Sequence, residues 1–212
     1  MNCKSYQIFP INLYEYEIED KSINEKIIKI LEGEEFINNG SNDVHPMARC
    51  YQTHHYLHKK IEYLPVISFI KDCLETHRKN LDFYCDGFDI TICWANKYPK
   101  YTASNQQNHT HKMSYISGIY YLTNGSPTYF LDPVTNRTYN SLEVNSKENI
   151  RQSIFAAEEG KLVLFPSWIE HGTIPHQDVY DRWSIAFNAM PTGKINPKFN
   201  KSGNPSCILE VK

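Results

Sequence analysis

Arg182-Trp183-Ser184-Ile185-Ala186-Phe187-Asn188 is the stretch that decides the fold, because polar or small residues alternate strictly with large apolar ones. Successive side chains of a strand point to opposite faces, so this period of two predicts a β-strand. Arg182, Ser184 and Asn188 would share one face, and the large apolar residues would form the other. An arginine buried without a partner is very costly, so an inward Arg182 implies an anionic partner.

Further strands are predicted upstream of this one. Runs rich in aromatic and β-branched residues, separated by turn residues, indicate strands at 88–96, 115–123, 126–131, 154–157 and 161–166. Many short strands of this kind are typical of a sandwich or jelly roll.

The first half of the chain predicts one or two strands within 6–17 and two helices. Ser22-Ile23-Asn24-Glu25 has the pattern of a capping box, with a helix following it until Gly33, and Leu64-Pro65 fits the first turn of the second helix. Residues 38–46 are turn-rich, 132–148 predict a polar insertion, and the chain after Pro191 predicts an irregular tail. We therefore expect a single domain, 1–212, with N-terminal support (1–87), a jelly-roll core (88–190) and a tail (191–212).

Composition excludes several classes of function. The 212 residues include 22 Lys and Arg against 24 Asp and Glu, so no basic excess favours nucleic acid as a partner. No apolar run approaches the ~20 residues of a membrane helix, and the start of the chain lacks the apolar segment of a signal peptide. Six cysteines without a CxxC pair indicate free thiols in a reducing compartment. We expect a soluble, cytoplasmic protein.

His109-Thr110-His111 and the later His171 are the candidate metal ligands. Residues i and i+2 of a strand point to the same side, so His109 and His111 can converge on one metal, with His171 expected from the opposite sheet. Imidazoles on one side of Fe(II) leave positions open for substrate and oxygen. The alternative is that His109 and His111 are surface residues following the polar run 104–108. The histidines of the segment 54–58 are expected at the surface.

The segment from Trp94 to Asn188 resembles the Fe(II)/2-oxoglutarate-dependent dioxygenase superfamily, and most of all the phage and bacterial oxygenases related to prolyl hydroxylases. The resemblance implies a mainly β protein with some α-structure, a cupin-like double-stranded β-helix (jelly roll) with N-terminal helices on the major sheet. The matching pieces arrive in the family's order: Trp94-Ala95-Asn96, His109-Thr110-His111, Ser117-Gly118-Ile119-Tyr120-Tyr121-Leu122, Phe165-Pro166-Ser167-Trp168 with His171-Gly172, and Arg182-Trp183-Ser184-Ile185-Ala186-Phe187-Asn188.

The resemblance also implies an Fe(II) centre and 2-oxoglutarate as co-substrate. His109 matches the first ligand, His111 the position of the usual carboxylate, and His171 the distal histidine. Arg182 matches the residue that holds the far carboxylate of 2-oxoglutarate. The other expected contacts are Tyr121, Ser184 and Asn96 on the co-substrate and, on the substrate side, Trp94, Asp132 and Asn188.

His111 departs from the family pattern, which has an aspartate or glutamate at this position. Three neutral imidazoles leave Fe(II) its full charge, which would strengthen binding of a dianion. Two arrangements stay open: His111 is a third ligand, or two histidines and water hold the iron. Asp132 could supply a carboxylate only if its strand runs close by.

The resemblance thus implies a dioxygenase that uses O2 to hydroxylate a small-molecule or peptide substrate, such as a prolyl or other amino-acid side chain. Two other functions stay open at this point. One is a catalytically silent jelly roll that binds a metal or a carboxylate, and the other is a three-histidine cupin-type oxygenase that needs no 2-oxoglutarate. Arg182 disfavours the cupin type, because that chemistry does not use a buried carboxylate clamp.

Overall fold

The computed structural model describes residues 10–38, 50–134, 151–196 and 209–211. Predictions for 6–9, for most of the turn-rich stretch 38–46, and for most of the insertion 132–148 lie outside these residues. Among the described residues, no helix combines the length and apolar character needed to cross a bilayer. The four described cysteines, Cys50, Cys73, Cys85 and Cys93, are buried free thiols.

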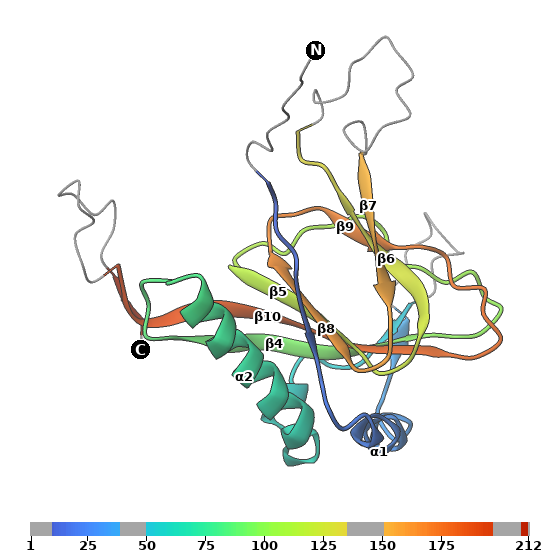
Figure 1. Cartoon of the computed structure of the whole chain (residues 1–212). Helices are drawn as coiled ribbons and strands as arrows, with labels where there is room; N and C mark the ends of the chain where they lie inside the picture. The colour runs from blue at the N-terminus through green and yellow to red at the C-terminus, as the bar shows by residue number, and fades with distance from the viewer. Residues whose placement is uncertain (1–9, 39–49, 135–150, 197–208, 212) are drawn as a thin grey trace, which may run out of the picture.

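A large sheet lies between the helices and the remaining strands (Figure 1), and every pairing between its strands is antiparallel. Its strands lie in the order β1-β8-β5-β10-β4-β3-β2, and β11 pairs with the end of β10. The bounds are β1 Tyr14–Glu17, β2 Ile37–Asn38, β3 Tyr51–Gln52, β4 Gly87–Tyr98, β5 Ile116–Tyr121, β8 Lys161–Pro166, β10 Arg182–Ile195 and β11 Leu209–Val211.

A small sheet faces the large one and closes the jelly roll. It has the order β7-β6-β9, with bounds β6 Gly125–Leu131, β7 Gln152–Ala157 and β9 His171–Thr173. An apolar cluster that includes Tyr121, Phe130, Val163 and Phe165 fills the space between the sheets. The predicted double-stranded β-helix is confirmed.

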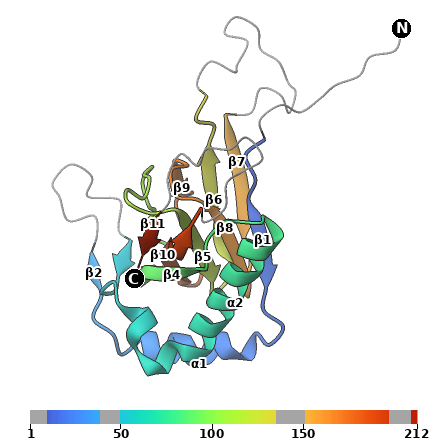
Figure 2. The same cartoon turned by 90° about the vertical axis from the view of Figure 1, so that its left-hand side faces the viewer.

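Both helices cover the outer face of the large sheet, away from β6, β7 and β9 (Figures 1 and 2). They are α1, Ser22–Leu31, and α2, Leu64–Asn80; two 3-10 turns, Leu57–Lys59 and Ile61–Tyr63, precede α2. Buried residues of both helices pack with Trp183, Ile185 and Phe187 of β10 in the main core. As the alternation predicts, the large apolar residues of β10 therefore face the helices. Arg182, Ser184 and Ala186 line a cavity on the opposite, inner face.

Two local predictions were wrong. Ser22 is the first residue of α1 and makes no side-chain cap; its backbone N–H donates to Asp20 Oδ1 at 3.0 Å instead. The chain after Pro191 is not wholly irregular, because β10 continues to Ile195 and pairs with β11 through Gly193, Lys194 and Ile195.

Candidate metal centre

Three histidines come together at one point between the sheets. Each of the three, His109, His111 and His171, offers one ring nitrogen as a ligand, and these nitrogens lie within 4.8 Å of one another. Among the described residues, this is the only group of three or more potential metal ligands that lie so close together. His171 is buried, and the other two are half-buried. This spacing allows all three imidazoles to contact a single ion.

Backbone pairing holds two of these ligands side by side. The His109 N–H donates to the His171 carbonyl at 3.0 Å and the His171 N–H returns the bond at 3.1 Å, while the His111 N–H donates to the Ser167 carbonyl. The expectation that His171 comes from the opposite sheet was therefore wrong. The segment around His109 is not a regular strand, but it extends the small sheet beyond β9 through this isolated bridge.

Hydrogen bonds also fix the tautomers of two histidines. His109 Nδ1 lies 2.8 Å from the Gln107 carbonyl, and His171 Nδ1 lies 3.0 Å from the Ile169 carbonyl. A carbonyl only accepts, so both Nδ1 atoms carry the proton and both Nε2 atoms keep a lone pair. Both rings are thus prepared to bind a cation through Nε2.

The three rings are neutral at neutral pH. Burial lowers the pKa of His171 to about 3 and that of His111 to about 4, and the pKa of His109 is lowered for the same reason. A neutral imidazole is the form that binds a metal, so the centre needs no deprotonation step near pH 7.

Arg182 occupies the far end of the cavity that the histidines line. The residue is 1% exposed, and neither Nε nor Nη1 has a hydrogen-bond partner among the residues that the structure describes. Its guanidinium carbon lies 4.5 Å from the Tyr98 ring centre and 5.4 Å from that of Tyr121. A buried cation with unused donors requires an anion, and the cavity is the available place for one.

Asn96, Ser184 and Tyr121 form one row across the large sheet. Ser184 on β10 is the direct partner of Asn96 on β4 and of Tyr121 on β5. Asn96 and Ser184 line the cavity. The Tyr121 hydroxyl instead donates to Thr128 Oγ1 at 2.9 Å, and Thr128 is the residue that reaches the cavity wall.

Of the three residues predicted on the substrate side, one lines the cavity and two do not. Trp94 lines the cavity, with its ring 5.8 Å from that of His111. Asn188 is buried outside the cavity lining, where its Oδ1 accepts a hydrogen bond from Ser117.

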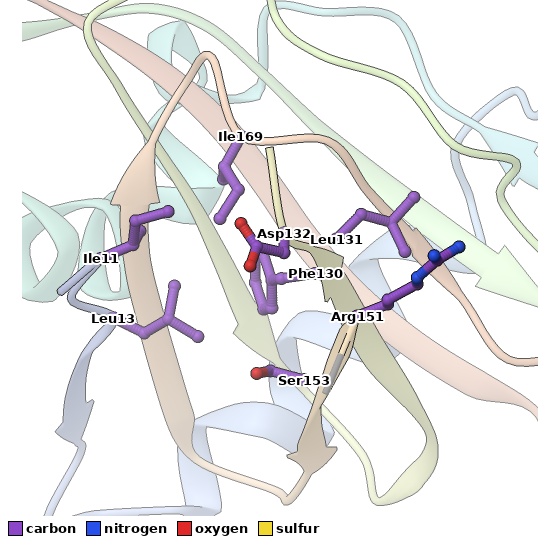
Figure 3. A pocket seen from close by; sticks show the side chains of 8 residues that line it. All are labelled: Ile11, Leu13, Phe130, Leu131, Asp132, Arg151, Ser153 and Ile169. Atoms are coloured by element: carbon purple, nitrogen blue, oxygen red, sulfur yellow. The ribbon is translucent and has the colours of Figure 1, made fainter. Parts of the chain in front are cut away.

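Asp132 lies in a different pocket, with Ile11, Leu13, Phe130 and Ile169 around it (Figure 3). Its Oδ1 accepts from the Val134 N–H at 2.9 Å, and it is not one of the grouped ligands. The suggestion that Asp132 supplies the missing carboxylate was wrong. Asp132 follows the end of β6, two residues beyond Phe130, the partner of His171, and it lines the other pocket.

Sequence reasoning missed several cavity residues, among them Gln52, Tyr98, Gln106, Thr128 and Thr173. Tyr98 could have been found, since it continues the alternation of Trp94 and Asn96 along β4. Gln52 comes from the two-residue strand β3, which has no periodic signal.

The cavity thus suits a divalent cation at one end and an acidic molecule reaching the other. The three imidazoles supply lone pairs, and Arg182 Nε and Nη1 supply unused donors. The jelly roll and this cavity are those expected from the resemblance to iron and 2-oxoglutarate oxygenases, except that His111 stands where that family has a carboxylate.

Comparison with known proteins agrees with this class. Residues 92–188 match the family described as "Putative 2OG-Fe(II) oxygenase", which confirms the predicted resemblance of this segment to the 2-oxoglutarate oxygenases. The match does not test the resemblance to phage enzymes. A search of curated protein sequences found no match.

Solved structures of low sequence identity share the fold. A prolyl-4-hydroxylase of Pseudomonas putida has a TM-score of 0.58 at 11% identity, covering 86% of this chain and 94% of that one. HygX of Streptomyces hygroscopicus, with nickel and 2-oxoglutarate bound, has a TM-score of 0.61 at 11% identity, covering 95% and 93%. The α-ketoglutarate-dependent epimerase SnoN of nogalamycin biosynthesis has a TM-score of 0.63 at 11% identity, covering 91% and 84%.

Proposed function

We propose that this protein is an Fe(II)/2-oxoglutarate-dependent oxygenase that hydroxylates a C–H bond of a small molecule or a peptide. The reaction would consume O2 and 2-oxoglutarate and yield the alcohol, succinate and CO2. The observation that carries the proposal is the pairing of two features in one cavity. These are the three grouped imidazoles and the buried guanidinium of Arg182, whose Nε and Nη1 have no hydrogen-bond partner in the described part of the chain.

In this proposal His109, His111 and His171 hold the iron, which supplies the activation of O2 when bound. Arg182 binds the far carboxylate of 2-oxoglutarate through its guanidinium, whose Nε and Nη1 donors have no hydrogen-bond partner among the described residues. Ser184 and Asn96 line the wall between the two ends. HygX and SnoN, whose structures hold a metal with 2-oxoglutarate, support this choice of ligands by analogy of fold.

The orphaned Arg182 favours this function over a three-histidine oxygenase that works without 2-oxoglutarate. Such an enzyme would keep a buried positive charge with no partner, at a cost of several kcal/mol. For the substrate we propose only a class, a prolyl or other amino-acid side chain. The similarity in fold to the prolyl-4-hydroxylase suggests this class.

The decisive experiment is succinate formation by anaerobically purified, iron-loaded protein after O2 is admitted, with and without 2-oxoglutarate. We expect succinate from 2-oxoglutarate, slowly even without the prime substrate. Tight binding of 2-oxoglutarate with no succinate under any condition would favour the silent jelly roll. Absence of 2-oxoglutarate binding would refute the proposal.

A further inference from the structure

Gln52 stands at the end of the row that crosses the large sheet. It is the direct partner of Asn96 in the β3–β4 pairing, so the row runs Gln52, Asn96, Ser184 and Tyr121 over four strands. Gln52 lines the same cavity as the histidines and Arg182, although it precedes the segment that matches the oxygenase family.

The orientation of the Asn96 side chain follows from its partners. Trp94 Nε1 lies 3.1 Å from Asn96 Oδ1, and an indole nitrogen only donates, so this atom of Asn96 must be the carbonyl oxygen. Gln52 Nε2 donates to the same oxygen at 2.8 Å. Cys50 Sγ adds a weak contact at 3.6 Å. The oxygen is therefore fully used.

The amide nitrogen of Asn96 has no hydrogen-bond partner within the described part of the chain. The residue is 6% exposed, and the wall that it occupies belongs to the cavity. Along β4, Trp94 contacts His111 and Tyr98 stacks on Arg182, so Asn96 lies between the metal end and the guanidinium end. Its N–H groups are therefore available to donate to a molecule that spans the two ends.

We infer that Gln52 is a positioning residue, which holds the Asn96 amide so that the pocket presents donors, and not an acceptor, to an acidic co-substrate. This inference rests on the proposed function for the identity of that co-substrate. Without the Gln52 bond, Asn96 would be held by Trp94 and the weak thiol contact alone. If its amide turned over, the carbonyl oxygen would face the carboxylates of 2-oxoglutarate and repel them.

Two substitutions of nearly equal size separate positioning from packing. Gln52→Leu removes the donor and leaves Trp94 to hold Asn96, so we expect roughly tenfold weaker 2-oxoglutarate binding, as for one lost hydrogen bond. Gln52→Glu replaces the donor by an acceptor, which draws the Asn96 amide nitrogen toward itself and turns the carbonyl into the pocket. We expect a larger loss, of roughly 30-fold or more. The added negative charge contributes to this loss by direct repulsion of the dianion, so the Trp94 resonance described below decides whether the Asn96 amide has turned.

Calorimetric titration of 2-oxoglutarate into nickel-loaded protein measures these affinities. The matched control is the same change, Gln152→Glu, at an exposed position of β7. Nickel affinity and melting temperature should stay close to wild type in both Gln52 variants. In turnover, the change should appear in KM for 2-oxoglutarate and not in kcat. Equal losses in the two variants, or wild-type affinity in Gln52→Glu, would overturn the inference.

The indole N–H resonance of Trp94 gives a readout that needs no co-substrate. In Gln52→Glu the turned amide no longer accepts from Trp94, so this resonance should shift, while those of Trp168 and Trp183 stay in place. Gln52→Leu should leave it close to its wild-type position. If wild-type protein binds no 2-oxoglutarate, the proposed function fails, whereas an unmoved Trp94 resonance in Gln52→Glu refutes the positioning role itself.

Discussion

Arg182 lies directly opposite Tyr98 in the pairing of β10 with β4, and its guanidinium carbon stacks 4.5 Å from the centre of the Tyr98 ring. The aromatic ring supports the flat face of the guanidinium without using its N–H groups. The N–H groups of Nε and Nη1, which have no partner among the described residues, stay available to bind an anion.

Replacement of Arg182 by alanine should weaken 2-oxoglutarate while leaving iron bound. Truncation of one partner of a buried charge pair costs about 2–5 kcal/mol, so we expect roughly 30-fold weaker binding or more. Lysine should restore only part, because it is a point charge and not a fork. Calorimetry on metal-loaded protein measures this, with exposed Arg151→Ala as control. Equal affinities for wild type and Arg182→Ala would remove Arg182 from the site.

The metal centre should depend on each of its two tautomer-fixed histidines. We expect His171→Ala to abolish binding of one Fe(II) per chain and His109→Ala nearly to do so, whereas exposed His54→Ala should bind normally. X-ray absorption of the wild type should give Fe–N distances of about 2.1 Å, in the range of imidazole ligation. Full iron binding by His171→Ala would contradict the assignment.

His111→Asp tests the departure from the family's usual ligand set. The aspartate should retain iron but reduce the net charge of the centre by one, so 2-oxoglutarate should bind more weakly than to wild type. Absorption spectroscopy for the ligand set and calorimetry for the co-substrate check the two parts. Unchanged coordination together with unchanged affinity would show that His111 does not ligate the metal.

Stability of the metal-free protein should fall on acidification. Burial lowers the pKa of His171 to about 3 and of His111 to about 4, against about 6.5 in an unfolded chain. Between these values the unfolded chain takes up protons that the folded protein does not. Stability should therefore be highest above pH ~6.5 and decline as the pH falls toward ~4.

Thermal unfolding of metal-free protein at pH 7.5, 5.5 and 4.5 measures this decline. His111→Asn removes one of the titrating groups, so its melting temperature should depend less on pH than that of the wild type. A wild-type melting temperature that does not change over this range would show that the histidines are not buried in a neutral form.

The sequence predicts those parts of the site that lie on long, regular strands. The alternation along residues 182–188 places Arg182 and Ser184 on the inner face correctly, because this stretch pairs with β4 in unbroken register and, from Ser184 onward, also with β5. Tyr98 was missed only because the strand was predicted to end at Asn96, two residues early.

Residues held by irregular pairing could not be predicted in the same way. His109 meets His171 through one isolated bridge, and Gln52 enters by a strand of two residues. Such contacts depend on segments far apart in the chain, and no local pattern of apolar residues encodes them. The prediction that Asp132 could supply a metal ligand was wrong for a related reason. The path of the chain after β6, and not distance along the sequence, decides which side chains lie near the histidines.

The paired backbones of His109 and His171 also bear on how strongly the protein resists unfolding and proteolysis. These two residues are about 60 positions apart, so an ion shared by them would act as a cross-link that closes a long loop of chain. Unfolding would then have to break the cross-link or carry the closed loop into a restricted unfolded state. Resistance to proteolysis should accordingly rise when the metal is added and fall when a chelator removes it.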